Sequence, residues 1–156
     1  MKMKTSLSVE SFDNTTMETE NAVVLHHIGY AVKSIEVEAP RFARLLGAMW
    51  DGVIYHDPLQ QARVSFLIAG NGLSTAPKFE LVEGDGEDAP LRRFVDKGGG
   101  LHHVCYEVAD LDAHVAQMKE LGAVLIKASV PAVAFNGRMV AWMFARPHLL
   151  LEYIER

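Results

Sequence analysis

Residues 25–32 read LHHIGYAV, and residues 101–108 return to the same pattern as LHHVCYEV. The sequence Leu-Gly-Ala follows each copy, at residues 46–48 and at residues 121–123. A repeat with this spacing predicts a duplicated structural unit of about 75 residues. Because each copy contains a histidine pair in a strand-like segment, the duplication also repeats a candidate metal ligand.

The pattern of hydrophobic residues gives both units the same order of elements. In the first unit it predicts a strand at 25–32, a helix at about 36–47, and strands near 49–56, 62–69 and 78–83. In the second it predicts a strand at 101–108, a helix from Asp110, and strands near 123–128, 137–145 and 149–155. We therefore predict an α+β fold, in which two tandem βαβββ modules form a curved mixed sheet around a metal-binding trough, with the helices outside.

The domain organisation follows from length and local composition. A chain of 156 residues suits one compact domain. Residues 1–22 are rich in Ser, Thr, Glu and Asn, which predicts a flexible N-terminal leader. The predicted single domain spans 23–156, with module 1 at about 24–84, a linker at 85–100 and module 2 at about 101–156.

Composition excludes several classes of function. The chain is 49% hydrophobic and 22% charged, which is typical of a globular protein, and no apolar run approaches the ~18 residues of a membrane span. A net charge of -5 without a run of Lys or Arg argues against nucleic-acid binding. The single Cys105 excludes an internal disulfide, and the absence of a secretory signal predicts a cytoplasmic protein.

Strand alternation assigns the two histidines of each pair to different faces of the sheet. It places His27 and His103 in the trough beside small residues, where a cavity has room. It places His26 and His102 on the opposite face, beneath the helices. The alternative for this second pair is a supporting role beside a metal ligand, and the alternation favours packing.

Each unit also ends in an apolar strand that carries one carboxylate, Glu80 in the first and Glu152 in the second. Glu80 follows His27 by 53 residues and Glu152 follows His103 by 49, so both halves offer the same two side-chain types at corresponding positions. An ionised carboxylate among apolar neighbours is costly unless it is paired or bound to a metal. Two imidazoles and two carboxylates suit a divalent ion such as Co, Mn, Zn, Ni or Fe(II). Hydrogen-bonded core histidines and solvated carboxylates are the alternative, but their repetition favours the metal.

Three stretches resemble a known family: HIGYAV at 27–32, FELVE at 79–83 running on to APLRRF at 89–94, and GLHHVCYEV at 100–108. Over about residues 24–156 the chain is similar to the vicinal oxygen chelate superfamily, which includes glyoxalases, bleomycin resistance proteins and dioxygenases. Within it, the chain most resembles the methylmalonyl-CoA epimerases. The resemblance implies that His27, Glu80, His103 and Glu152 bind the metal.

The same resemblance implies a metal-dependent isomerase that abstracts an α-proton from an acyl-CoA or related small-molecule substrate, through a metal-stabilised enolate. Glu152 and Glu80 are then the catalytic acid and base. Ser65 stands where some epimerases carry a further glutamate. The turn at 145–149 is shorter than is common in the family, which leaves coenzyme A recognition open. By resemblance and by the usual frequency of symmetric assemblies, the protein is expected to be a homodimer.

Three alternative functions stay open at this level. A glyoxalase I-like lactoylglutathione lyase would use the same four ligands. An oxygenase would need Fe(II) held by two histidines and one carboxylate, and the fourth ligand weighs against it. A non-catalytic binding or resistance protein would use the trough to hold an apolar molecule. Trp142 and Phe135 could line such a pocket, although the apolar pattern favours packing.

Overall fold

The computed structural model describes residues 22–72, 76–86 and 89–156. The leader predicted at residues 1–22 therefore lies outside the described residues, apart from Ala22. Within the described part, no helix is both long and apolar enough to cross a membrane. The domain boundaries inferred from the sequence stay a prediction.

The elements follow the duplicated order. The first half contains β1 (Val24–Ala31), α1 (Ile35–Leu46), β2 (Met49–Trp50), β3 (Tyr55–Asp57), β4 (Ala62–Ile68), α2 (Ala69–Gly72) and β5 (Lys78–Gly84). The short helix α3 (Arg92–Asp96) lies in the connection. The second half contains β6 (Gly100–Val108), α4 (Leu111–Glu120), β7 (Val124–Pro131), the 3₁₀ turn η2 (Val133–Phe135), β8 (Met139–Ala145) and β9 (Leu149–Glu155).

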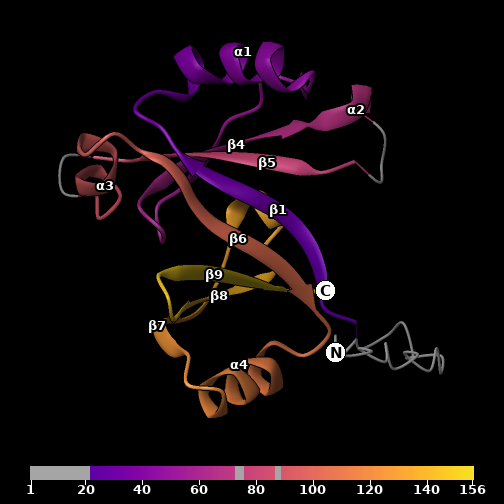
Figure 1. Cartoon of the computed structure of the whole chain (residues 1–156), viewed down its shortest axis with the longest axis vertical. Coiled ribbons are helices and arrows are strands. Elements are labelled where there is room, and N and C mark those ends of the chain that lie inside the picture. The colour runs from indigo at the N-terminus through magenta and orange to yellow at the C-terminus, as the bar shows by residue number, and fades with distance from the viewer. Residues whose placement is uncertain (1–21, 73–75, 87–88) are drawn as a thin grey trace, which may run out of the picture.

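Across the described residues the strands form one nine-stranded sheet with the order β2-β4-β5-β1-β6-β9-β8-β7, and β3 pairs with the outer side of β4. The pairs β1–β5 and β6–β9 are parallel, and the other pairs are antiparallel. Strands β1 and β6 run side by side through the centre and join the halves, with α1 at one end of the molecule and α4 at the other (Figure 1). The predicted fold class, a curved mixed sheet built from two βαβββ units, is confirmed.

Both long helices begin at residues whose side chains cap the first turn. The Ser34 side chain accepts a hydrogen bond from the Val37 amide at the start of α1, and the Asp110 side chain accepts one from the Ala113 amide at the start of α4. Helix α1 ends at Gly47, whose φ of 58° is a left-handed conformation that glycine adopts without strain. These caps fix where each helix lies against its half of the sheet.

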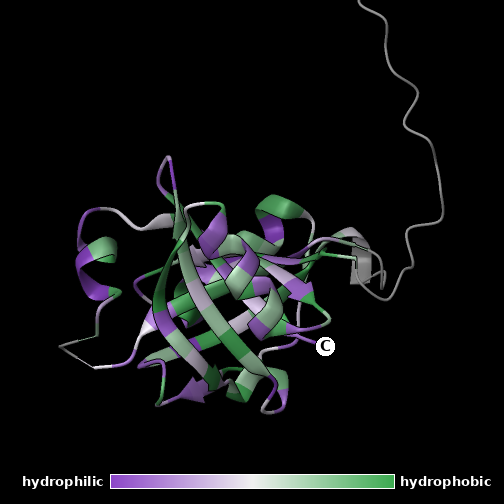
Figure 2. Cartoon of the chain, turned by 90° about the horizontal axis from the view of Figure 1, so that it is seen from below, coloured by the Kyte–Doolittle hydropathy of each residue, from purple (hydrophilic) through white to green (hydrophobic). Residues whose placement is uncertain are grey.

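Each helix covers its own hydrophobic cluster. Ile35 of α1 packs with Leu67 and Leu81, whereas Leu111 of α4 packs with Met143 and other residues of the second half. Hydrophobic colours predominate along the central strands, and hydrophilic residues gather mainly at helix faces, loops and strand ends (Figure 2). The helices thus occupy the outer face of the sheet and leave its inner face for the site.

The single strand predicted at 49–56 is wrong, because β2 and β3 are separated by residues 51–54. The Asp51 side chain accepts a hydrogen bond from the Val53 amide at 2.9 Å, and Gly52 adopts a φ of 81°. A short polar side chain that bonds the backbone two residues on, followed by a glycine with positive φ, favours a turn over an extended strand.

Candidate metal centre

The two glutamates occupy equivalent positions in the two halves. Glu80 on β5 pairs with Gly29 on the parallel strand β1, and Glu152 on β9 pairs with Cys105 on the parallel strand β6. Gly29 and Cys105 each lie two residues after the inward histidine of their strand. Because side chains alternate along a strand, each glutamate therefore lies on the same face as the histidine of its half.

The two inward histidines meet across the seam between β1 and β6. His27 pairs with Cys105, and His103 pairs with Gly29. A Cβ atom at Gly29 would lie 2.0 Å from Cε1 of the His103 ring, so a side chain at this position would displace that ring. The glycine therefore creates the space in which His103 approaches the cluster.

The structure brings together all four side chains that the sequence indicated. His27 Nε2 lies 3.0 Å from His103 Nε2, 3.4 Å from Glu80 Oε2 and 3.3 Å from Glu152 Oε2. His103 Nε2 lies 3.2 Å from Glu80 Oε2 and 3.7 Å from Glu152 Oε2. One donor atom from each residue lies within 4.8 Å of all the others, and all four residues are buried. We call His27, Glu80, His103 and Glu152 the central cluster.

These distances fit a divalent cation. Nitrogen and oxygen ligands about 2.0 to 2.2 Å from a common ion lie roughly 3.0 to 3.5 Å from neighbouring ligands. Glu152 Oε2 is buried and accepts no hydrogen bond of standard geometry within the described part of the chain. A buried oxygen without a donor is costly, and coordination to a cation would compensate it. The central cluster therefore has the donor types, spacing and unsatisfied oxygen that an ion requires.

Contacts within the central cluster shift the pKa values of His27 and Glu80. Burial lowers the pKa of His27, but the negative charge of Glu80 and contacts with both carboxylates outweigh burial and raise that pKa to about 9. Burial raises the pKa of Glu80, yet the charge of His27 and a hydrogen bond from His103 hold that pKa well below its usual range. Without a cation, a proton on His27 thus partly neutralises the carboxylates, and an incoming ion must displace it.

The prediction that His26 and His102 pack beneath the helices is wrong. On β1, Leu25 pairs with Tyr106 and His27 with Cys105, so His26 is an extra residue in the register. On β6, His102 is likewise skipped, between the residues that pair with Gly29 and Tyr30. Each is a β-bulge, which interrupts the alternation of faces and redirects a side chain.

As a result, each bulged histidine contacts the inward histidine that follows it. His26 Nδ1 lies 2.8 Å from His27 Nδ1, and His102 Nδ1 lies 3.0 Å from His103 Nδ1. Burial, together with the adjacent inward histidine, lowers the pKa of both His26 and His102 to about 4, so both are neutral near pH 7, and in one of its two tautomers each can accept at Nδ1. Accepting a proton from Nδ1 of the inward histidine leaves its Nε2 lone pair free for the central cluster.

The Ser65 side chain contacts β2 and the turn that follows it. Its buried hydroxyl accepts a hydrogen bond from Trp50 Nε1 at 2.7 Å and donates one to the Val53 carbonyl at 2.6 Å. The residue of β4 that pairs with Glu80 is Phe66. Ser65 therefore serves the packing between β2 and β4, and β4 places an aromatic ring beside the central cluster.

A cavity of about 340 Å³ adjoins the central cluster and is lined by Glu80 and Glu152. We call it the Glu-lined cavity. Trp142 also lines it, with its ring centroid 4.8 Å from that of His103 and its Nε1 donating to Gln60 Oε1 at 2.7 Å. Sequence reasoning favoured packing for Trp142 and missed Gln60. The pairing of Trp142 with Glu152 in the last hairpin is the signal that would have placed Trp142 at the site.

Comparison with known proteins identifies a family for this chain. Residues 26–142 match the family described as the glyoxalase/bleomycin resistance protein/dioxygenase superfamily. The chain belongs to this superfamily. A relative from Cereibacter sphaeroides, ethylmalonyl-CoA/methylmalonyl-CoA epimerase, is 32% identical over 121 residues, which cover 76% of this chain and 86% of the relative.

Solved structures give the same assignment of fold. A hypothetical protein from Bacillus halodurans matches with a TM-score of 0.73 and 30% identity, covering 86% of this chain and 95% of that one. A Streptomyces coelicolor methylmalonyl-CoA epimerase variant in complex with 2-nitronate-propionyl-CoA matches with a TM-score of 0.71 and 21% identity, covering 86% and 98%. Superfamily membership thus rests on the sequence matches, and the solved structures show the same fold.

Proposed function

We propose that the protein is a divalent-metal-dependent epimerase that removes and returns the α-proton of an acyl-CoA, with methylmalonyl-CoA as the first substrate to test. The observation that carries the proposal is the central cluster, two histidines and two glutamates, beside a cavity large enough for a small ligand. The 32% identity to the Cereibacter sphaeroides epimerase supports the choice of reaction.

His27, Glu80, His103 and Glu152 would hold the ion. When bound, a divalent ion supplies Lewis-acid polarisation to a carbonyl oxygen of the substrate, which acidifies the adjacent carbon. In the ion-bound state both inward histidines would be neutral, and His26 and His102 would orient them by accepting their Nδ1 protons across contacts of 2.8 Å and 3.0 Å. The metal could be Co, Mn, Zn, Ni or Fe(II), since all accept nitrogen and oxygen ligands.

Proton transfer is assigned to the two glutamates. Epimerisation requires a proton to leave one face of the α-carbon and to return to the other face. Glu80 and Glu152 both line the cavity and are related by the approximate twofold symmetry of the halves, so they approach a substrate from different sides. We assign removal of the proton to Glu152 and its return on the opposite face to Glu80, which must first take up a proton because His27 and His103 hold its pKa low in the ion-free cluster.

Apolar side chains in the walls of the Glu-lined cavity limit the access of water to this chemistry. They include the apolar side chains of Val82, Leu91, Phe94 and Leu150. A site that excludes water strengthens electrostatic interactions and limits unwanted proton exchange. Lys127 also lines the cavity and donates a hydrogen bond to the Leu59 carbonyl at 2.6 Å, which ties β7 to the loop before β4.

The test is exchange of the α-proton of methylmalonyl-CoA for deuterium in D₂O, with metal content measured on the same sample. Replacing Glu152 with Gln should slow exchange by about 10² to 10⁴ because a general acid or base contributes that much. Glu155→Gln, on the same strand, is the matched control and should keep the activity. Undiminished exchange by a folded Glu152→Gln variant would remove Glu152 from the mechanism.

The same central cluster would also suit a lyase of the glyoxalase I type, which acts on a hemithioacetal of glutathione. Its proton transfer uses the same kinds of group. Turnover of methylglyoxal with glutathione, without exchange on methylmalonyl-CoA, would favour this second candidate. A protein that retains ligand binding in the Glu152→Gln variant but catalyses neither reaction would be a binding protein.

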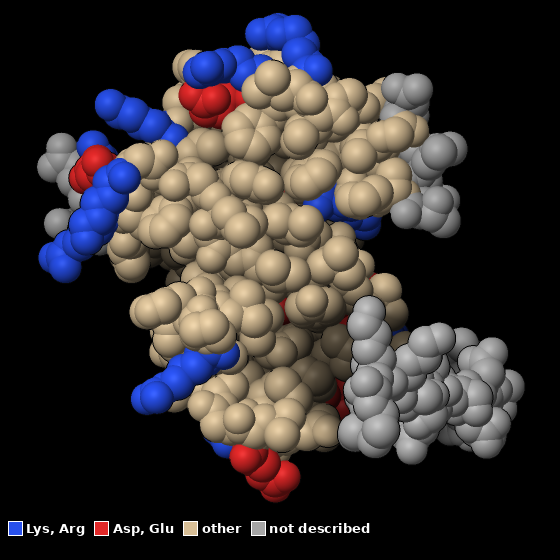
Figure 3. All heavy atoms as spheres, viewed as in Figure 1, with Lys and Arg blue, Asp and Glu red and all other residues tan. Residues whose placement is uncertain are grey.

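We also propose that the protein is a homodimer. Val24, Leu25 and Leu101, at the ends of the central strands, are 46%, 48% and 60% exposed, which is high for large apolar side chains. The face above β1 and β6 in Figure 3 is largely free of charged side chains. Apolar surface of this kind favours association. Light scattering coupled to gel filtration should give twice the mass of one chain, and replacing Leu101 with Lys should weaken the dimer.

A further inference from the structure

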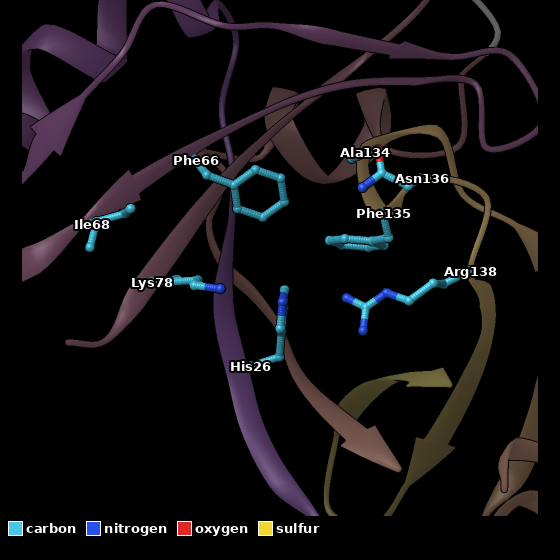
Figure 4. Close-up of a pocket in the computed structure, with 8 residues that line it drawn as sticks. All are labelled: His26, Phe66, Ile68, Lys78, Ala134, Phe135, Asn136 and Arg138. Carbon is cyan, nitrogen blue, oxygen red and sulfur yellow. The ribbon is translucent and has the colours of Figure 1, made fainter. Parts of the chain in front are cut away.

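A second cavity, of about 360 Å³, lies on the other side of the inward histidines and contains no member of the central cluster. Its lining includes His26, Phe66, Ile68, Lys78, Phe135 and Arg138 (Figure 4). We call it the Lys78 cavity. Its volume lies within the range of about 300 to 1,000 Å³ that is typical of small-molecule sites.

Duplication explains why a second cavity exists. The bulged histidine His26 lines the Lys78 cavity, and its counterpart His102 lines the Glu-lined cavity. Phe66, which pairs with Glu80, corresponds in the same way to Trp142, which pairs with Glu152. The two cavities are therefore equivalent places in the two halves of the molecule.

The equivalent cavities differ in charge. Lys78 lies two residues before Glu80, where the second half has Leu150 two residues before Glu152. Within the described ranges, the Lys78 ammonium has no hydrogen bond or ion pair. Arg138 pairs with Glu107, and its guanidinium lies 5.8 Å from the Phe135 ring centroid. Two cations against one carboxylate leave the cavity with an excess of positive charge.

The positions of these groups suit an anion. Lys78 and Arg138 point towards the middle of the cavity from opposite sides, with His26 between them (Figure 4). Arg138 has further N–H donors besides the one that bonds Glu107. An ammonium and a guanidinium that face each other across a cavity form charge-assisted hydrogen bonds to an anion placed between them.

Most of the remaining wall is apolar and separates this cavity from the central cluster, and Asn136 adds one polar side chain. The Phe66 and Phe135 rings contact each other at 5.7 Å between centroids, and lie 5.6 Å and 5.9 Å from the His27 ring. Ile68 adds a third apolar side chain. A ligand here would rest on these aromatic rings without reaching the central cluster. These walls favour a ligand with an apolar body over inorganic phosphate, which needs polar donors on all sides.

We propose that the Lys78 cavity binds a small organic carboxylate with a short aliphatic or single-ring body, independently of the epimerase substrate. The carboxylate lies between Lys78 and Arg138, and the body packs on Phe66 and Phe135. Because both rings contact His27, occupancy of this cavity also fixes the rear wall of the central cluster.

The experiment uses full-length protein with labelled isoleucine methyl groups, titrated with benzoate and followed by NMR. Ile68 lines the Lys78 cavity and Ile126 lines the Glu-lined cavity, so the two methyl signals report on the two sites separately. We expect benzoate to shift Ile68 and leave Ile126 unchanged. Benzamide, which has the same ring without the charge, should bind much more weakly.

Lys78→Leu, which introduces the residue found at the equivalent position 150, should weaken benzoate binding by about tenfold or more, as expected for losing a hydrogen bond to a charged group. Lys119→Leu removes the same charge from an exposed position on α4 and should leave binding unchanged. An unmoved Ile68, a shift at Ile126 alone, or equal binding of benzamide overturns the proposal even if Lys78→Leu does not fold. Undiminished affinity in folded Lys78→Leu also overturns it.

Discussion

The two halves of the molecule agree at the central cluster and differ around it. Each half supplies one histidine and one glutamate, at the same register of a parallel strand pair. The neighbouring positions have diverged, since Lys78 corresponds to Leu150. Neither half holds a complete set of four donors. A change at one donor therefore disables the shared site, whereas a wall residue can change in one half without affecting the other.

The largest effect is expected when one inward histidine is removed from each half in turn, which tests whether both halves supply ligands to one site. His27→Ala and His103→Ala should each weaken binding of Zn²⁺ or Co²⁺ on the order of several hundredfold, because each removes one of four ligands. Competition with a chromogenic chelator measures the loss. His56→Ala, at an exposed histidine of β3, is the control. Unchanged affinity in either variant would contradict a site shared by the two halves.

The second prediction concerns the proton that His27, in the first half, holds when no ion is bound. The pKa of His27 is raised from 6.5 to about 9, so its protonated form stabilises the ion-free protein below pH 6.5, and this stabilisation is lost as the pH rises towards 9. A metal must displace that proton, so its apparent affinity should rise about tenfold per pH unit between pH 7 and 9. Chelator competition across this range tests the expectation. Affinity that is flat with pH would show that His27 is already neutral.

The positions beside the inward histidines should respond unequally. Gly29→Ala would place a Cβ within 2.0 Å of the His103 ring, so His103 must move, and metal affinity should fall by roughly thirtyfold. Cys105→Ala, at the equivalent position of the second half, removes a thiol that contacts Glu152 but adds no atom beside a histidine ring, so metal affinity should fall much less. The same chelator assay compares them. Equal losses would mean that the ring of His103 tolerates the added atom.

The smallest effect is expected at the bulged histidines. His26→Phe and His102→Phe keep a ring but remove the acceptor for Nδ1 of the inward histidine, so metal affinity should fall about tenfold. His26→Asn and His102→Asn retain an acceptor and should lose less. Calorimetric titration with Zn²⁺ measures both series. An equal loss in the Phe and Asn variants would point to packing, and no loss would show that the Nδ1 contacts do not orient the ligands.

The order of the elements could be predicted from the sequence because the repeat gives both halves the same pattern. Hydrophobic periodicity predicted both long helices, and Asp110 marked the start of the second, because these signals are local; Ser34, which caps the first, was not used in the prediction. The strand at 49–56 was wrong, since alternation outweighed the turn signal of Asp51 and Gly52. The fold class needed only the order of elements, and an error in one edge strand does not change that order.

The candidate site was predictable where the halves match and unpredictable where the register is irregular. Glu80 and Glu152 could be selected because duplication gave each a counterpart. His26 and His102 were assigned to the wrong face because alternation assumes an unbroken period of two, and a bulge depends on pairing with a distant strand. Ser65 shows the same limit, because its environment depends on Trp50 and Val53 across a turn.

The seam between β1 and β6 has a consequence for unfolding. His27 and Glu80 belong to one side of this seam, and His103 and Glu152 belong to the other. An ion held by all four would be released as soon as either side came apart, so binding would couple the two sides into one cooperative unit. Loss of the ion would remove this link and leave the β1–β6 ladder and contacts such as Trp142–Gln60 and Lys127–Leu59 to join the two sides, so amide exchange along β1 and β6 should become faster.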